Sequence, residues 1–201
     1  MSPRQLWALY EPVHAVTYFA PEAQQAFAEA GLRGFWRGYF AGRTAPLGPV
    51  GPAPVTALYA GFAPAMVERA LPGVWDLVTP ERALAVRLDG AVAALARLTD
   101  GLDDQVAEAA PLLRAAAEAA EVGGRALGEA NAGLPWPDAP LAVLWQAATV
   151  LREVRGDGHV AAQLTAGLSG LETMVLRSGH DLDRTVLQPH RGWTDDDWTA
   201  A

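Results

Sequence analysis

The sequence predicts an all-α fold, arranged as a single multi-helix bundle. Apolar residues recur at the three- and four-residue spacing of a helix in most segments. Prolines, capping residues and glycines separate these segments in the way that helix starts and ends do. Strand-like alternation is weak everywhere. Because 51% of the 201 residues are apolar, the chain can bury a core of ordinary size.

Four helical segments are expected before residue 44. The first covers residues 3–10, and Pro12 is expected in the first turn of the second, a position that suits proline. Pro21 begins the third, which Gly31 ends. The fourth, residues 32–43, is rich in aromatic side chains and contains three glycines, which permit the close approach of another helix or a ligand.

The stretch 44–55 contains four prolines and two glycines. It predicts a rigid, non-helical connector, either a stiff loop or a lid over a cavity. Two long helices follow: Thr79 caps the first, and Asp103 or Asp104 caps the second, which Pro111 kinks or ends. Both carry charge along one side and Ala or Leu along the other, so we expect outer helices without a site.

A helix-turn-helix-like corner is predicted near residues 141–176. Asp138 is expected to cap the helix that enters it. Gly156 then ends that helix, and Asp157 caps the next one. Residues 160–176 contain a single charged side chain, which indicates a helix buried on most sides.

The last residues predict the start of another helix. Residues 1–190 are expected to form one helical domain, and residues 191–201 begin a further element, with Thr194 as N-cap and three aspartates in its first turn. A helix of one or two turns is not stable alone. We therefore expect this end to be truncated or to dock on a partner.

The absence of Lys and Cys excludes much chemistry. The chain can form no Schiff base with pyridoxal phosphate and can hold no iron–sulfur cluster or cysteine-bound zinc. Ser2, Ser169 and Ser178 all lie outside a Gly-x-Ser-x-Gly motif, so we do not expect a serine hydrolase. Any cofactor is otherwise unknown.

The charge and hydropathy of the sequence indicate which classes of partner to expect. The net charge is −8 and no segment is basic overall, so we do not expect this chain alone to bind DNA. No apolar run reaches the roughly 18–20 residues of a membrane span, and the first residues lack the apolar stretch of a signal peptide. We expect a cytoplasmic protein with a small-molecule ligand and no membrane contact; a homodimer is one option for its assembly.

The first candidate site comprises Glu11, His14 and Tyr18. Their spacing of three and four residues places them on one face of a helix. Glu-x-x-His is half of the motif of carboxylate-bridged dimetal bundles, and no second copy is found, so Glu11 and His14 are weak metal candidates. Two other interpretations are hydrogen bonding to a buried ligand, and a histidine and tyrosine satisfied within the core.

The second candidate site is the aromatic segment. Phe35, Trp36 and Tyr39, together with Arg43, are expected to line a pocket for a flat or anionic molecule, or to be ordinary core with a surface arginine. Trp145 is open to the same two interpretations.

The third candidate site lies in the predicted corner and comprises Arg152, Glu153, Asp157 and His159. Capping and ion pairing explain part of it. In the functional interpretation, Glu153 lies beside His159 where two helix ends converge, and the pair performs acid–base chemistry.

Several stretches taken together resemble an actinobacterial family of SalK-like proteins, also described as helix-turn-helix proteins: LWALYEPVHAVTYFAPEA, GLRGFWRGYFAGRTAPLGPVGP, LPWPDAPLAVLWQAATVLREVRGDGHVAAQL and RGWTDDDW. The resemblance runs over the whole chain. It implies that relatives continue past RGWTDDDW into a winged-helix-like tail of the type seen in MarR regulators, a tail that this chain lacks. It implies a fold and no mechanism.

Two functions follow from these observations. The first is a small-molecule-binding helical protein that serves as the sensory part of a transcriptional regulator. The alternative is a small enzyme of specialised metabolism, which uses His14, Tyr18, Glu153 and His159 for acid–base or metal-assisted chemistry.

Overall fold

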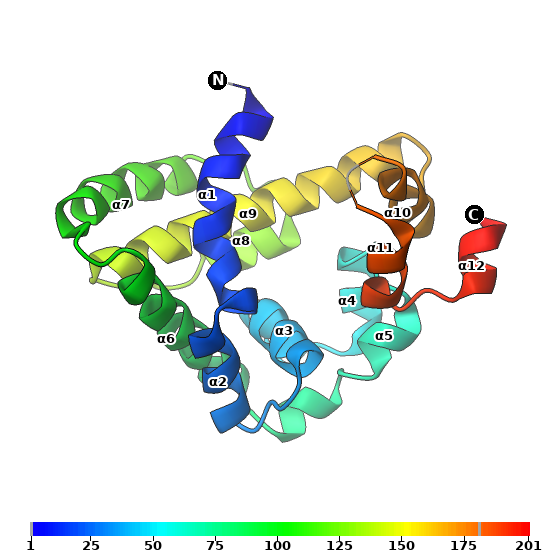
Figure 1. Cartoon of the computed structure of the whole chain (residues 1–201), viewed down its shortest axis with the longest axis horizontal. Coiled ribbons are helices and arrows are strands. Elements are labelled where there is room, and N and C mark those ends of the chain that lie inside the picture. The colour runs from blue at the N-terminus through cyan, green and yellow to red at the C-terminus, as the bar shows by residue number, and fades with distance from the viewer. Residues whose placement is uncertain (1, 181) are drawn as a thin grey trace.

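The computed structural model describes residues 2–180 and 182–201, and all regular structure within these ranges is helical (Figure 1). The predicted all-α fold is confirmed. The α-helices are α1 (Pro3–Phe19), α2 (Pro21–Glu29), α3 (Phe35–Thr44), α4 (Pro52–Leu58), α5 (Pro64–Glu68), α6 (Pro80–Leu98), α7 (Asp103–Glu118), α8 (Ala126–Ala132), α9 (Pro140–Thr165), α10 (Gly170–Ser178), α11 (Arg184–Arg191) and α12 (Asp195–Ala200). Two 3-10 segments, η1 (Ala45–Leu47) and η2 (Gly73–Asp76), complete the order. No helix in the described part of the chain is long and apolar enough to cross a membrane.

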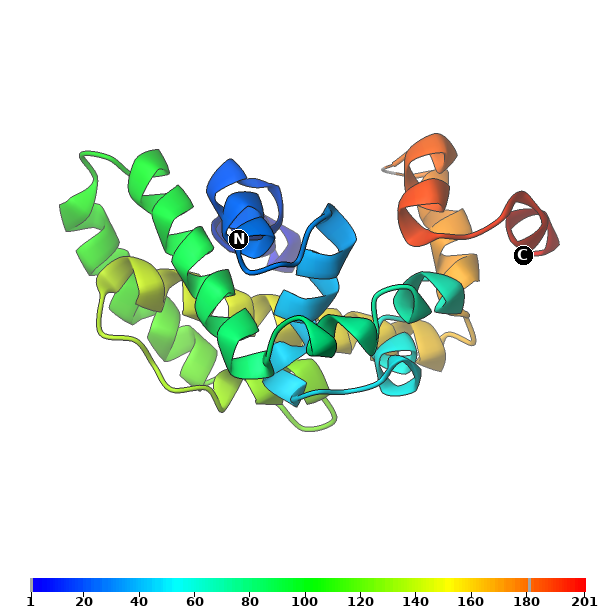
Figure 2. The same ribbon diagram turned by 90° about the horizontal axis from the view of Figure 1, so that it is seen from below.

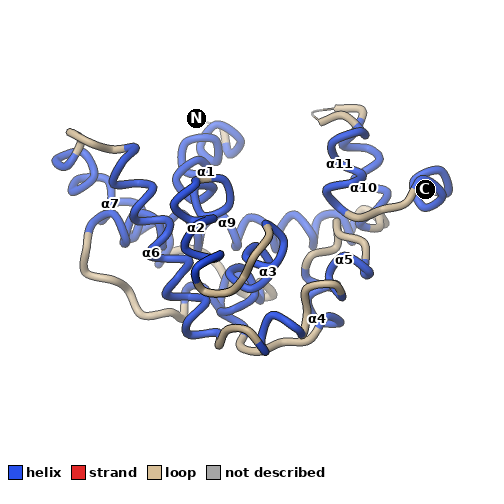
Figure 3. The backbone as a smooth tube through the Cα atoms, turned by 60° about the horizontal axis from the view of Figure 1, so that its bottom comes forward, coloured by secondary structure: helices blue, strands red, loops and turns tan. Residues whose placement is uncertain are grey.

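Helix α9 is the helix against which several others pack. It is 26 residues long, and α1, α6, α7 and α8 all pack against it (Figure 1). Helices α10, α11 and α12 follow its C-terminal end and form a small group at one end of the molecule (Figure 2). Seen from a third direction, α10 and α11 stand opposite α1, α2 and α3 (Figure 3). The candidate sites lie on the elements around α9.

Helix α1 is continuous across Pro12, so the predicted break at this residue is wrong. A capping box begins the helix: the Ser2 side chain accepts from the backbone N–H of Gln5, and the Gln5 side chain accepts from the N–H of Ser2. A proline in a helix interior costs about 3 kcal/mol, because it removes a backbone hydrogen bond and its ring crowds the preceding turn. Packing of α1 against α6 and α9 offsets this loss. His14 and Tyr18 thus lie on successive turns of one helix.

The stretch 44–55 is helical at both ends, which corrects the prediction of a non-helical connector. Pro46 lies in η1 and Pro52 opens α4, positions in a first turn where a missing N–H removes no internal bond. Only residues 48–51 between them are non-helical, and Gly48 has a φ of +79°, which favours glycine. The segment is a short link between two packed pieces.

Helix α9 is also continuous where a corner was expected. Gly156 and Gly158 lie inside it, and the chain turns at Gly167, with a φ of +73°, before Ser169 caps α10. The corner therefore falls within residues 141–176 but about ten residues later than the glycine pair suggested.

Asp157 caps a different helix from the one predicted. Its Oδ2 accepts hydrogen bonds of 2.9 Å from the backbone N–H groups of both Leu127 and Gly128, in the first turn of α8. These are two of the donors that a helix N-terminus leaves unsatisfied. A carboxylate from α9 thus fixes α8 in place.

The glycines near this contact allow α8 to approach α9. A Cβ on Gly128 would lie 2.7 Å from Val154 Cγ2, and a Cβ on Gly158 would meet the guanidinium of Arg125. That guanidinium lies across α9 and donates to the Val154 carbonyl at 2.6 Å. Of the two glycines that suggested a turn, Gly158 leaves room for the Arg125 side chain instead.

Helix α6 is central, not an outer helix. It packs against α1, α2, α3 and α9, and its Arg87 is buried. Thr79 caps it as predicted, by accepting from the N–H of Arg82 at 3.2 Å. By contrast, the N-cap of α7 is Leu102, and Pro111 lies within that helix without ending it.

Helix α9 begins differently from the prediction. Its N-cap is Ala139, which makes no side-chain cap, so the role predicted for Asp138 is wrong.

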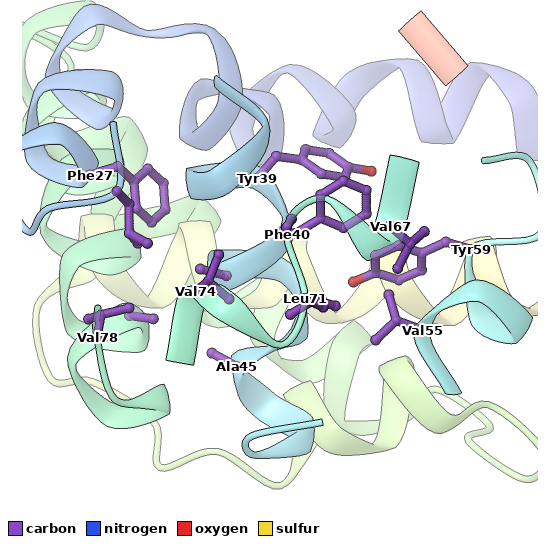
Figure 4. Close-up of a cluster of buried hydrophobic side chains, with 14 of the residues drawn as sticks. Phe27, Tyr39, Phe40, Ala45, Val55, Tyr59, Val67, Leu71, Val74 and Val78 are labelled. Atoms are coloured by element: carbon purple, nitrogen blue, oxygen red, sulfur yellow. The ribbon is translucent and has the colours of Figure 1, made fainter. Parts of the chain in front are cut away.

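The largest core lies under α3, α4 and α5 and includes Phe40, Tyr59 and Leu71 (Figure 4). Phe27 of α2 enters it against Gly38 and Gly42, where an added Cβ would lie within 3 Å of the phenyl ring. The expectation that glycines in this aromatic helix permit close approach is confirmed at these two positions.

A separate small core joins the last helices. Trp198 of α12 packs with Met174 and Leu187, and the predicted Thr194 cap is present, within a capping box completed by Asp197. In the stretch 160–176 only Met174 is buried and Leu164 is 67% exposed, which contradicts the prediction of a buried helix.

Candidate functional site

A buried ion pair joins α3 to α9. Arg43 Nε donates to Glu153 Oε1 at 2.9 Å, and Arg43 Nη2 donates to Oε2 at 3.0 Å. The third nitrogen, Nη1, donates to the Tyr39 hydroxyl at 2.8 Å, and the guanidinium lies 3.9 Å from the ring centroid of Tyr59. Such a two-point contact fixes both side chains, because the planar fork of arginine matches the two carboxylate oxygens.

A second arginine shares the same carboxylate. Arg152 Nη1 lies 2.8 Å from Glu153 Oε2, but this contact lacks hydrogen-bond alignment, and Arg152 Nε has no hydrogen-bond partner among the described residues. Burial alone would raise the pKa of Glu153, but Arg152 and Arg43 hold it well below its usual range. Glu153 is therefore ionised, and two guanidinium groups surround one negative charge.

His14 lies near this group, within the electrostatic influence of Arg152 and Glu153. Its Nδ1 is 3.0 Å from Thr149 Oγ1, and its Nε2 is 3.2 Å from the Tyr18 hydroxyl. Because the Thr149 hydroxyl already donates to the Trp145 carbonyl, it accepts from Nδ1–H, and Nε2 accepts from Tyr18. Burial and the nearby Arg152 lower the pKa of His14 well below 6.5. His14 is thus neutral, in a single tautomer.

Three tyrosines complete what we name the central cluster. This cluster consists of His14, Tyr18, Tyr39, Arg43, Tyr59, Arg152 and Glu153. Burial raises the pKa of Tyr18 and of Tyr59. Burial would also raise the pKa of Tyr39, but Arg43 and Arg152 lower it below 10.0. The cluster has a positive electrostatic character that favours anionic oxygen.

A small cavity borders the central cluster. It has a volume of about 230 Å³ and lies between α1, α2 and α3, where Tyr18, Phe27, Phe35 and Tyr39 line it. Thr17 also lines it, and its buried hydroxyl has no hydrogen-bond partner in the described structure. Aromatic walls with a few polar groups are typical of small-molecule sites, although this volume is below the usual range of about 300–1,000 Å³.

The structure brings most of the predicted site residues together, in pairings that the sequence did not indicate. His14, Tyr18, Tyr39, Arg43, Arg152 and Glu153 form the cluster, and Phe35 lines the adjacent cavity. Trp145 is buried behind His14, with the two rings stacked 6.3 Å apart.

Four predicted residues are not members of the cluster, although Trp36 contacts the Tyr39 ring with 5.4 Å between ring centroids. Asp157 caps α8, and Glu11 accepts from Trp7 Nε1 at 2.7 Å. Trp36 packs against the main core. His159 lies six residues after Glu153 on the same continuous helix and contacts Gln163, so the predicted Glu153–His159 pair does not form. Thr149, the partner of His14, and His159 are ten residues apart on α9, about 15 Å of helix rise, so the two histidines do not share a site.

Arg87 and Asn131 were missed by sequence reasoning. Arg87 donates to the Gly42 carbonyl at 3.0 Å and to Asn131 Oδ1 at 3.2 Å, with all three groups buried beside the cluster. The sequence did contain one indication that Arg87 is buried. Arg87 lies on the same side of its helix as Ala83, Gly90 and Ala94, which is the apolar side. An arginine on an apolar stripe predicts a buried partner.

The protonation states of the cluster do not suit acid–base catalysis. A general acid or base works best with a pKa near 7. The pKa of His14 and of Glu153 lie well below their usual values, and that of Tyr18 lies far above 10.0. Among the described residues, no three His, Asp or Glu side chains are grouped as a metal ion would require. The arrangement suits the recognition of an anionic group.

Comparison with known proteins adds one finding. Residues 3–201 match the model of a group of proteins described as the helix-turn-helix family. No curated protein and no solved structure matches the chain.

Proposed function

Since the chain belongs to the helix-turn-helix family, we propose that it is the small-molecule-binding part of a regulator, and that its ligand is a small aromatic anion such as an aromatic carboxylate. The ligand occupies the cavity between α1, α2 and α3, against the hydroxyls of Thr17, Tyr18 and Tyr39. On this proposal the protein acts in the cytoplasm, as one of the SalK-like group whose longer relatives carry a winged-helix tail. This chain alone does not bind DNA, in keeping with its net charge of −8.

The observation that carries the proposal is the charge balance of the cluster. Arg43 and Arg152 share the single carboxylate of Glu153, which leaves one buried positive charge without a full partner. Burying an uncompensated charge costs several kcal/mol, and an anion placed nearby offsets part of that cost. Tyr18 and Tyr39, which line the cavity, lie within the field of both arginines. An anionic ring in the cavity would hydrogen bond to these tyrosines and feel the same field.

Benzoate and benzamide form a matched pair of probes for this proposal, because they share a shape and differ in charge. We expect benzoate to bind at least about tenfold more tightly than benzamide in isothermal titration calorimetry at low salt, since a hydrogen bond to a charged group adds about 1.5–3 kcal/mol. Equal binding of the two probes, or binding of neither, would exclude an anion site in this cavity.

Two variants locate the probe. Thr17→Val keeps the shape of the side chain and removes the unpartnered hydroxyl at the cavity wall. Arg152→Gln removes one of the two cluster cations. We expect both to weaken benzoate binding, and only Arg152→Gln to remove most of the preference over benzamide. Arg33→Gln, at an exposed position outside the cavity, is the matched control for the change in charge.

A further inference from the structure

We propose that a second, separate site for a small organic phosphate lies in the groove between α1, α9 and α10. This groove, which we name the arginine groove, has a volume of about 680 Å³ and is lined by Arg4, Arg155, Arg177, His159 and His180, together with apolar side chains. It shares no lining residue with the cavity between α1, α2 and α3. The proposal therefore stands whether or not that cavity binds a ligand.

The charge of the groove is opposite to that of the chain. The chain carries a net charge of −8, yet three arginines line the groove, and none of its described lining residues is a carboxylate. Burial lowers the pKa of Arg155; Glu11 opposes this shift, whereas Arg152 and Arg177 add to it. Neighbouring like charges repel one another. A bound anion would relieve that repulsion.

The remaining lining residues indicate the rest of the ligand. Trp7 and Leu176 give the groove an apolar wall. Trp7 is held in place by its hydrogen bond to Glu11, at 2.7 Å, and by the guanidinium of Arg155, 4.8 Å from its ring centroid. Several guanidinium groups match the oxygens of a phosphate, and an indole wall suits a ring or chain attached to it.

The groove favours a small molecule over a nucleic acid. Its cationic side chains line a concave space whose volume is in the ordinary range for small ligands, about 300–1,000 Å³. A duplex needs a cationic surface of several phosphate contacts, and the net charge of −8 repels a polyanion at a distance. The geometry therefore assigns an organic phosphate to the groove.

Phenyl phosphate is the probe that tests this assignment. We expect the 201-residue chain to bind it in isothermal titration calorimetry at low salt, more tightly than inorganic phosphate. Arg155→Gln is expected to weaken binding about tenfold or more, because it removes a charged donor. Arg33→Gln makes the same change in charge at an exposed position outside the groove and is expected to change the affinity less than twofold.

Two further measurements keep the test decisive. If Arg155→Gln lowers the melting temperature markedly, Arg4→Gln is tested in its place. Arg4 lines the groove at an exposed position, and its substitution should also weaken the binding of phenyl phosphate. Benzoate affinity is measured on the same variants and should change little, which separates this groove from the cavity. The assignment is wrong if phenyl phosphate does not bind, if Arg33→Gln weakens it as much as Arg155→Gln, or if duplex DNA binds through Arg155 and phenyl phosphate fails to compete.

Discussion

Arg43 and Glu153, which are 110 positions apart in the sequence, form a buried two-point ion pair between α3 and α9. Arg152, the neighbour of Glu153, approaches the same carboxylate. One carboxylate therefore forms ion pairs with two guanidinium groups in the interior of the bundle. The stability of the bundle and the binding properties of its cavity both depend on this arrangement.

Glu153→Gln tests how much the fold depends on the shared carboxylate. The variant leaves two guanidinium groups near a neutral amide in a buried setting. Removal of one partner from a buried ion pair costs about 3–5 kcal/mol, so we expect a loss of this size in the free energy of unfolding, measured by urea denaturation at pH 7.

An exposed glutamate provides the control for this substitution. Glu108→Gln, on the exposed side of α7, makes the same chemical change and should alter stability by less than about 0.5 kcal/mol. If both variants lose the same small amount, the pair contributes no more to stability than a surface contact.

The pH dependence of stability follows from Glu153 and His14. The folded pKa of Glu153 is depressed, so its contribution is complete above the ordinary value of 4.5 and is lost as the pH falls toward the folded value. His14 is neutral in the folded state, whereas the unfolded chain binds a proton below about pH 6.5. Both groups bind protons more readily in the unfolded state. The free energy of unfolding should therefore decrease as the pH is lowered below 6.5, by up to about 1.4 kcal/mol per pH unit for each group.

The variant His14→Asn separates the two contributions. It should flatten the stability curve between pH 6.5 and 5 and leave the decline at lower pH, as measured by chemical denaturation at a series of pH values. His159→Asn is the comparison: burial and Arg155 lower the pKa of His159 as well, but its side chain is exposed, so we expect a smaller flattening. An unchanged slope in His14→Asn would show that the neutral state of His14 does not contribute.

Local signals in the sequence predicted two helix caps correctly and helix continuity poorly. Thr79 and Thr194 cap their helices as expected, because a capping hydrogen bond involves residues three apart. Pro12 and Gly156 were expected to break helices and do not. Their effect on an isolated helix is at most a few kcal/mol, which packing against other elements outweighs. That packing involves residues distant in the sequence.

Gly156→Ala is a direct test of helix continuity. In a continuous helix, alanine is more favourable than glycine by about 1 kcal/mol, and the nearest atom to an added Cβ, Glu153 Oε2, lies 3.7 Å away, an ordinary contact. We therefore expect Gly156→Ala to stabilise the protein by about 0.5–1 kcal/mol in urea denaturation. A glycine that formed a turn would respond in the opposite direction.

Gly158→Ala is the matched comparison. An added Cβ here meets the end of the flexible Arg125 side chain, which would have to leave its hydrogen bond to Val154. The loss of this bond and the gain in helix propensity are each about 1 kcal/mol, so the net change should be close to zero. Destabilisation of both variants by more than about 1 kcal/mol would contradict a continuous α9.

The site was predicted in its parts but not in its connections. Residue types alone singled out Arg43, Arg152, Glu153, His14 and Tyr18. The assignment of Glu153 to His159 failed because it relied on proximity in the sequence across a turn that does not exist. The actual partners of Glu153 are Arg43 of α3 and its own neighbour Arg152, and only the tertiary fold brings α3 to α9.

Asp157→Ala tests the cap that α9 provides to α8. The variant leaves the buried N–H groups of Leu127 and Gly128 without their acceptor. Loss of an N-cap acceptor costs about 1–2 kcal/mol, and buried donors make the upper end of that range the expected result at pH 7. Asp157→Asn keeps one acceptor oxygen and should lose less than half as much. Amide hydrogen exchange at Leu127 and Gly128 should accelerate in Asp157→Ala and remain slow in Asp157→Asn. Equal losses in the two variants would mean that the charge of Asp157, and not its acceptor oxygen, stabilises α8.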